Sequence, residues 1–249
     1  MLAVLTLCGA ILIGISLGMM GAGGSILMTP LLVLILHRPE KLAIAESLAI
    51  VAGMAAFGTW TYMQTSEIDW RSVFIFGIPG IVGAYSGSYF SFYISAWWQM
   101  ILLACMSVLI AVLMLFSPNQ MPWRFSNKWL SPFGFGTGVI TGIIGIGGGF
   151  VIVPALIALR GISMQAAVGA SLVIIFLNAI TSCIMHLMQL HVLQVQVSWS
   201  TILFISIAGI CGVVIGKKIA KYFSEKYLKR LFGSVILMVG FTLLIHLIA

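Results

Sequence analysis

The chain has 249 residues, of which 61% are hydrophobic and only 7% are charged, and its mean hydropathy is +1.20. Soluble domains carry about 25% charged residues, so this composition excludes a water-soluble fold. The apolar stretches are longer and more continuous than the roughly 9–11-residue alternating strands of a membrane β-barrel, which leaves a bundle of helices. The net charge of +7 is typical of basic loops that orient membrane proteins and does not indicate nucleic acid binding. The cysteines lie inside apolar runs without Cys-x-x-Cys spacing, so they are predicted to be packing residues and neither disulfides nor metal ligands. No cofactor is predicted.

Eight apolar blocks follow one another along the sequence. They span residues 2–36, 42–63, 73–94, 97–116, 132–159, 164–188, 197–215 and 231–248. A transmembrane helix needs about 20 residues, and six of the blocks fit this length. The first and the fifth block are longer, and glycines interrupt both of them. We therefore expect an all-α, polytopic membrane protein.

The interruption of the first block returns in the fifth. Residues 18–25 read Gly-Met-Met-Gly-Ala-Gly-Gly-Ser, and residues 142–149 read Gly-Ile-Ile-Gly-Ile-Gly-Gly-Gly. Each stretch is followed by a proline, Pro30 or Pro154. A shift of 124 positions superposes the two regions without a gap, and five further residues in a later loop bring the remaining matches into register. The sequence therefore predicts an internal duplication.

Each repeat is predicted to contain a Gly-broken helix pair plus three transmembrane helices. The first membrane repeat spans residues 1–120, the inter-repeat loop 121–131 and the second membrane repeat 132–249. If each broken block enters and leaves the membrane on one side, the repeats are inverted and ten of the 12 basic residues share one side; an odd number of crossings gives nine against three. The positive-inside rule thus favours inverted repeats, and it places the loop from Lys217 to Arg230 in the cytoplasm in either arrangement.

The glycine breaks predict a binding site for an anion. A break leaves backbone N–H groups without intrahelical partners, which hydrocarbon does not tolerate. In the second repeat, the flanking residues 132–144 and 150–159 would form helices about 20 and 15 Å long, too short for a core about 30 Å thick. The glycines should therefore lie deep. The helices that begin after Gly24 and Gly149 would point their partially positive N-termini into a cavity, a geometry that suits an oxyanion and that marks transport sites in other folds.

Candidate ligands come from the glycine triplets and from the helix after each break. Ser47 and Ser171 occupy matching positions, where a hydroxyl either donates to an anion or caps the helix. Asn178 lies two turns beyond Ser171 on nearly the same face, and Thr181 and His186 extend this polar line. The predicted substrate-binding residues are Gly21, Gly23, Gly24, Ser25, Gly145, Gly147, Gly148, Gly149, Ser47, Ser171 and Asn178. Other glycines predict close helix packing instead: Gly14, Gly18, Gly80, Gly83 and Gly87.

Two further residues are candidates for proton coupling. Glu46 either reaches the transport path or forms an interfacial ion pair with Lys41 or Arg38. His186 aligns with Tyr62 of the first repeat and titrates near neutral pH in water, although a histidine at a helix end is also typical of the membrane interface.

The segments that carry both repeats' motifs are residues 18–30 and 142–154, Ala45-Glu46-Ser47-Leu48 and Gly169-Ala170-Ser171-Leu172, and Asp69-Trp70 and Ser198-Trp199. This doubled pattern resembles the TauE/SafE sulfite exporter family, also called the 4-toluene sulfonate uptake permease family, over almost the whole chain. The resemblance implies a bacterial inner-membrane transporter for sulfite, organosulfonates or thiosulfate, without ATP-binding machinery. The first repeat departs from the second at Ser25, which stands opposite Gly149, and at Tyr62.

The sequence leaves two other functions open. An anion channel would use the same N–H donors at the membrane midplane as a carrier. The Gly-x-Ser-x pattern around Ser171 also fits an intramembrane serine protease with His246 as its base, but a catalytic serine has no reason to be duplicated at Ser47. We therefore predict a secondary transporter, not an enzyme, whose partners are a small sulfur-containing anion and the lipid bilayer.

Overall fold

The computed structural model describes residues 2–21, 25–64, 68–116, 129–145, 149–220, 222 and 225–248, and its regular elements in these ranges are all α-helices. The predicted all-α fold is confirmed. In chain order, the helices are α1 (Leu2–Met20), α2 (Ser25–Leu34), α3 (Glu40–Met63), α4 (Trp70–Ser91), α5 (Ala96–Phe116), α6 (Leu130–Ile144), α7 (Gly149–Arg160), α8 (Met164–Val192), α9 (Trp199–Ile219) and α10 (Glu225–Ile248).

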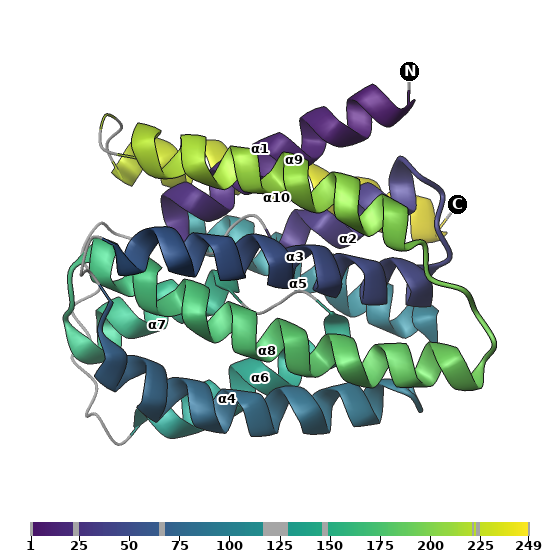
Figure 1. Ribbon diagram of the computed structural model, residues 1–249, viewed down its shortest axis with the longest axis horizontal. Helices are drawn as coiled ribbons and strands as arrows, with labels where there is room; N and C mark the ends of the chain where they lie inside the picture. The colour runs from purple at the N-terminus through teal and green to yellow at the C-terminus, as the bar shows by residue number, and fades with distance from the viewer. Residues whose placement is uncertain are drawn as a thin grey trace.

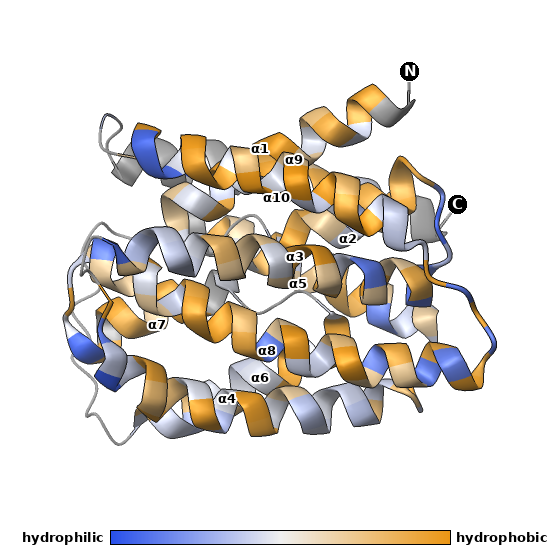
Figure 2. Cartoon of the chain, viewed as in Figure 1, coloured by the Kyte–Doolittle hydropathy of each residue, from blue (hydrophilic) through white to orange (hydrophobic). Residues whose placement is uncertain are grey.

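The surface of the bundle is suited to lipid. Four helices, α3, α4, α8 and α9, are long and apolar enough to cross a membrane. Large apolar side chains point outward from them and from α10, among them Phe204, which is 66% exposed. Figure 2 shows the hydrophilic residues gathered mainly toward the two ends of the bundle. The chain is therefore a multi-pass membrane protein, as its composition predicted.

The two Gly-broken blocks each form a pair of helices. α1 and α2 have 19 and 10 residues, and α6 and α7 have 15 and 12. At 1.5 Å per residue, α2, α6 and α7 fall well short of a hydrocarbon core about 30 Å thick. The expectation of short helices beside the break of the second repeat is confirmed by α6 and α7. Both chain termini lie at the right-hand end of the bundle in Figure 1.

The helices pair in a reciprocal way. α1 packs chiefly against α9 and α6 against α4, while α3 packs on α8 and α5 on α10. If α1–α5 are exchanged with α6–α10, the α1–α9 and α4–α6 pairings turn into one another, and the α3–α8 and α5–α10 pairings each turn into themselves. Exchange of the two halves therefore leaves the pattern of helix pairing unchanged.

Glycines bring the paired helices into backbone contact. A Cβ atom on Gly14 would collide with the carbonyl oxygen of Gly209, and one on Gly138 would collide with that of Gly80. The same reciprocal contacts join Gly18 to Val213, Gly142 to Ala84, Gly83 to Phe135, Gly212 to Ile11, Gly87 to Val139 and Gly216 to Ile15. The predicted role of these glycines in close helix packing is confirmed.

Candidate functional site

Two glycines end the first helix of each broken block. Gly21 follows α1 with φ 65°, and Gly145 follows α6 with φ 76°. Their N–H groups donate to the carbonyls of Leu17 and Thr141 at 2.8 and 2.7 Å. A left-handed glycine at this position is a common helix C-terminus, and a side chain there would strain the backbone. The remaining predicted glycines, Gly23, Gly24, Gly147 and Gly148, lie outside the described residues.

A serine from the opposite half contacts each glycine turn. The hydroxyl of Ser171 donates to the carbonyl of Gly21 at 3.0 Å, and that of Ser47 donates to the carbonyl of Gly145 at 3.3 Å. Each hydroxyl also lies 2.8 Å from the carbonyl three residues earlier in its own helix. Because a hydroxyl has one hydrogen to donate, the two carbonyls share it. Both serines are fully buried, so the structure places each pair in the interior.

The second helix of each broken block also begins in the interior. α2 starts at Ser25 and α7 at Gly149, both of which are buried, and the two helices contact one another. The hydroxyls of Thr29 on α2 and Ser47 on α3 lie 2.8 Å apart. Sequence reasoning missed Thr29, although its position one turn beyond Ser25 and next to Pro30 is a signal that it shares the face of Ser25.

Asn178 lies fully buried on α8. Neither its Oδ1 nor its Nδ2 has a hydrogen-bond partner among the described residues, and the same holds for the buried hydroxyl of Ser182. The amide faces α4, because a Cβ atom on Gly80 would lie 3.1 Å from Oδ1. The hydroxyl of Thr181 donates instead to a carbonyl of its own helix at 2.8 Å. The polar line on α8 therefore also includes Ser182, and the place of Thr181 in it stays a prediction.

His186 and Tyr62 make equivalent contacts. Nε2 of His186 lies 3.1 Å from the carbonyl oxygen of Gly142, and the hydroxyl of Tyr62 donates to the carbonyl of Gly18 at 3.0 Å. Since a carbonyl only accepts, this contact assigns the proton of a neutral imidazole to Nε2. The ammonium of Lys217 lies 4.5 Å from the centre of the Tyr62 ring. A role for His186 in proton coupling stays a prediction.

Glu46 belongs to an ion-pair cluster. Its side chain is fully buried, Oε1 accepts from the N–H of Ser198 at 3.2 Å, and Oε2 lies 3.5 Å from Nε of Arg38. Arg38 also donates to the hydroxyl of Thr201 at 3.2 Å, whereas Lys41 lies over an aromatic ring. Of the two predicted ion-pair partners, Arg38 is the one that Glu46 contacts.

A second cluster, which sequence reasoning missed, joins α4 to α7. Arg160 donates to Oδ2 of Asp69 and to the hydroxyl of Ser72, both at 3.2 Å, and Ser72 donates to Asp69 at 2.6 Å. Burial alone would raise the pKa of Asp69, but the hydrogen bonds from Ser72 and Arg160 and the charge of Arg160 outweigh it and hold the pKa below its ordinary value. The one available signal was the opposite charges at the ends of two blocks.

The protease alternative requires a base beside Ser171. The hydroxyl of Ser171 instead donates to the carbonyls of Gly21 and Val168. The side chain of His246 lies outside the described residues. The described contacts of Ser171 are therefore those of a residue that joins two helices.

Comparisons with known proteins agree with a transport function. The family model described as "Sulfite exporter TauE/SafE" matches residues 6–243. A "probable membrane transporter protein" of Xylella fastidiosa (strain 9a5c) is 30% identical over 239 residues, which cover 92% of this chain and 90% of the relative. The "probable membrane transporter protein YunE" of Bacillus subtilis is 24% identical, with 89% and 90% covered. The "probable membrane transporter protein MJ0441" of Methanocaldococcus jannaschii is 27% identical, with 94% and 92% covered. No solved structure gives a significant match.

Proposed function

Because the chain belongs to the sulfite exporter TauE/SafE family, we propose that it is a secondary transporter that moves a small sulfur-containing anion across the bacterial inner membrane. Sulfite, an organosulfonate and thiosulfate are the substrates we propose. Relatives named as probable membrane transporters support the transport function. The anion would be bound by backbone N–H groups at the two glycine breaks, with the hydroxyls of Ser47 and Ser171 as additional donors.

One observation carries this proposal: each glycine turn is contacted by a buried serine from the other half. The Ser171 contact to Gly21 and the Ser47 contact to Gly145 keep non-helical backbone away from lipid, as hydrocarbon requires. α2 and α7 begin directly beyond these turns, with the positive ends of their dipoles inside the protein. A serine that rotates from its carbonyl acceptor toward a bound oxyanion would add a donor without any movement of the backbone.

We further propose that residues 1–120 and 132–249 are inverted repeats. The reciprocal helix pairing and the shared location of both termini support this arrangement. The bundle end that holds Arg160 and the Lys217–Arg230 loop would face the cytoplasm by the positive-inside rule. The end that holds Arg38 would face outward. Cysteines introduced at residues 95 and 222 should therefore react with an impermeant thiol reagent from opposite sides of sealed vesicles.

Flux into proteoliposomes tests the substrate and the site together. The vesicles would be given labelled sulfite, thiosulfate or ethanesulfonate, and we expect saturable uptake and counterflow of at least one of them. A hydrogen bond to a charged group contributes about 1.5–3 kcal/mol, so Ser47→Ala and Ser171→Ala should each raise the half-saturating concentration at least tenfold. Gly148→Leu should block flux and leave membrane insertion intact.

Ser163→Ala provides the matched control, because this serine is exposed at the start of α8 and lies outside the proposed site. Wild-type flux in all three site variants would overturn the site assignment. No flux of any tested sulfur anion by the wild-type protein would overturn the substrate class. Conductance far above carrier turnover would favour the anion channel instead.

A further inference from the structure

The interior of α8 carries polar atoms that the described protein residues do not satisfy. Both polar atoms of the Asn178 amide and the hydroxyl oxygen of Ser182 have no hydrogen-bond partner there. Both side chains are 0% exposed and lie one helical turn apart. Buried polar atoms in folded proteins nearly always have a partner. Three such atoms together therefore indicate a site where a bound ligand or water supplies the hydrogen bonds.

The equivalent place in the first half is apolar. A shift of 124 positions relates Asn178 to Met54 and Ser182 to Gly58. Met54 faces α9 at Gly209 in the same way that Asn178 faces α4 at Gly80. Met54 and Asn178 thus each lie against a glycine of the neighbouring helix. The first half has a thioether at this position, and the second half has an amide.

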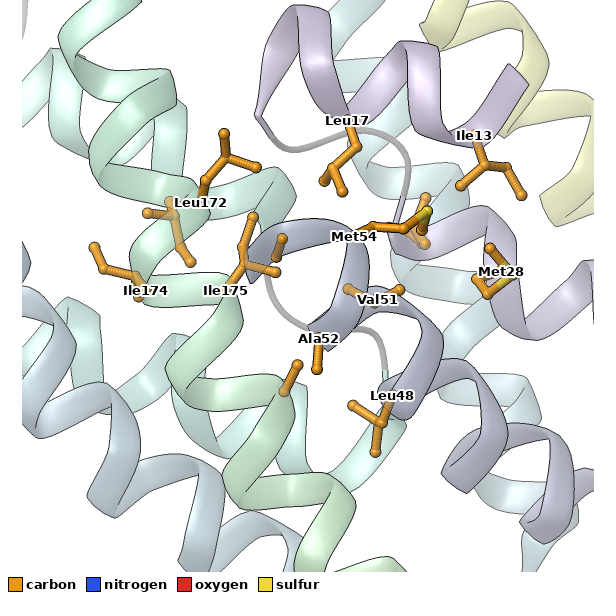
Figure 3. Packing of buried hydrophobic residues seen from close by; sticks show 14 of the residues in the cluster. Ile13, Leu17, Met28, Leu48, Val51, Ala52, Met54, Leu172, Ile174 and Ile175 are labelled. Atoms are coloured by element: carbon orange, nitrogen blue, oxygen red, sulfur yellow. The ribbon is translucent and has the colours of Figure 1, made fainter. Parts of the chain in front are cut away.

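The residues around Met54 are also less polar than those around Asn178. Figure 3 shows Met54 among apolar side chains that include Ile13 and Leu17 of α1. The shift relates these two positions to Thr137 and Thr141 of α6, whose hydroxyls donate to carbonyls of their own helix. In the first half, the buried hydroxyls without a described partner are those of Ser16 and Thr59. An amide with both of its atoms unpaired occurs only in the second half of the described chain.

The unpaired atoms belong to a polar face of α8. Ser171, Asn178, Ser182 and His186 are spaced by seven, four and four residues, which places them on one side of α8. Ser171 contacts the Gly21 turn and His186 contacts a carbonyl of α6. One turn further, Gln189 donates to a carbonyl of α4 at 2.7 Å. Polar groups therefore extend from a glycine turn toward the end of the bundle that holds both termini (Figure 1).

We propose that the corner between α4, α6 and α8 is the hydrated section of the anion path, where Asn178 and Ser182 bind the oxygens of the anion and its accompanying water. This inference rests on the proposed transport function. Nδ2 of Asn178 and the hydroxyl of Ser182 are donors for an oxyanion, and Oδ1 of Asn178 accepts from water. The equivalent corner between α1, α3 and α9 has Met54 in this place, packed in the apolar core.

Cysteine labelling compares the two corners directly. In a protein whose four native cysteines are replaced, we would introduce Asn178→Cys, Ser182→Cys and the mirrored control Met54→Cys. The probes are the sulfonatoethyl methanethiosulfonate anion, which is itself an organosulfonate, and its trimethylammonium counterpart. The anion should react at positions 178 and 182 at least tenfold faster than at 54 and faster than the cation does, and ethanesulfonate should slow it.

The outcomes separate this inference from the proposed function. Equal reaction rates at positions 54 and 178, or no reaction at 178 in a protein that transports ethanesulfonate, would overturn the path through this corner and leave the transport function standing. A preserved difference between the two corners, in a protein that moves no sulfur anion, would count against the proposed substrate and support the accessible corner.

An apolar replacement distinguishes a role in transport from a role in folding. Asn178→Leu removes an amide whose atoms have no described partner, so we expect an equal or higher melting temperature in detergent and at least a tenfold loss of flux. Met54→Leu is the matched control and should change neither quantity. A clear fall of the melting temperature in Asn178→Leu, or wild-type flux in the same variant, would overturn the assignment.

Discussion

The contact surface between α1 and α9 and that between α4 and α6 are built in the same way, but the residues beside them differ. In both, a glycine Cα lies against a carbonyl oxygen of the partner helix at matching positions. Next to the α4–α6 contact are Asn178 of α8 and Thr141 of α6, whereas the matching residues next to the α1–α9 contact are Met54 of α3 and Leu17 of α1. Backbone contact allows a single residue type at the contact itself, but the side chains next to it are free to change. The symmetric part of the molecule thus sets the fold, and functional differences should be sought where the symmetry fails.

The two ends of the bundle differ in a related way. Arg38 and Arg160 both donate to a hydroxyl in the first turn of a long helix, α9 or α4. The carboxylate that completes the cluster comes from α3 at one end, as Glu46, and from the residue before α4 at the other, as Asp69. Glu46 is fully buried and the Asp69 side chain is 21% exposed. The same kind of arginine–carboxylate contact therefore involves a buried carboxylate at one end of the bundle and a partly exposed carboxylate at the other.

The largest effect is expected where both contact surfaces admit only glycine. Gly142→Val and Gly18→Val place a Cβ atom against the carbonyl oxygens of Ala84 and Val213, so the paired helices must move apart. We expect roughly 3 kcal/mol or more of destabilisation in each case, measured as a lower melting temperature and loss of monodisperse protein in detergent. Gly136→Val is the control on the same helix, because a Cβ atom there meets nothing within 4 Å. Equal behaviour of the three variants would refute the close-packing account.

The next largest effect separates the two arginines. Removal of one partner from a buried ion pair lowers the free energy of unfolding by about 3–5 kcal/mol. For Arg38→Met we expect a loss at or below the lower limit of this range, because the Arg38 side chain is 30% exposed. Arg160→Met should cost about 1 kcal/mol, since water reaches Asp69. Unfolding in detergent measures both, and Glu46→Gln should restore part of the stability in the Arg38→Met background. Equal losses in the two single variants would contradict the difference in burial.

A smaller effect concerns pH at the Asp69 end. The pKa of this carboxyl is lowered in the folded protein from the reference value of 3.8. A lowered pKa contributes stability that is present above the pKa of the unfolded chain and is lost as the pH falls through that of the folded one. The melting temperature should therefore decrease below about pH 4, and Asp69→Asn should decrease less steeply between pH 5 and pH 3. Parallel profiles would argue against this pairing.

The smallest effect compares the starts of α8 and α3. The hydroxyl of Ser163 accepts from the N–H of Ala166 at 3.3 Å, whereas Pro39, at the equivalent start of α3, has no side-chain cap. Loss of such a cap typically costs about 0.5–2 kcal/mol, and we expect the lower limit here because the bond is exposed. Ser163→Ala should lower the melting temperature slightly and leave flux unchanged. A cost as large as that of Arg38→Met would show that the serine has a further contact.

The sequence predicted those features that lipid and backbone geometry dictate. A chain with this composition has one way to satisfy its backbone in hydrocarbon, and the spacing of Gly14 and Gly18 predicted a contact that no larger residue can make. Ser182 shows a limit of the sequence analysis. Both Thr181 and Ser182 lie close to the face of Asn178, and only the structure shows that the Ser182 hydroxyl has no partner among the described residues while the Thr181 hydroxyl donates to its own helix. The pairing of Arg160 with Asp69 joins residues 91 positions apart, and the opposite charges at the ends of two blocks were the one signal for it.

The contact of each glycine turn with a serine of the other half has a consequence for biosynthesis. α1 leaves the ribosome long before Ser171, which contacts its glycine turn, and before α9, against which it packs most closely. Until those segments arrive, the carbonyl of Gly21 and the glycine face of α1 lack their final partners. The first half is thus inserted into the bilayer as an unfinished structure, and its completion depends on synthesis of nearly the whole chain. A nascent protein that stops after α5 would present this unfinished surface to lipid and to quality-control proteases.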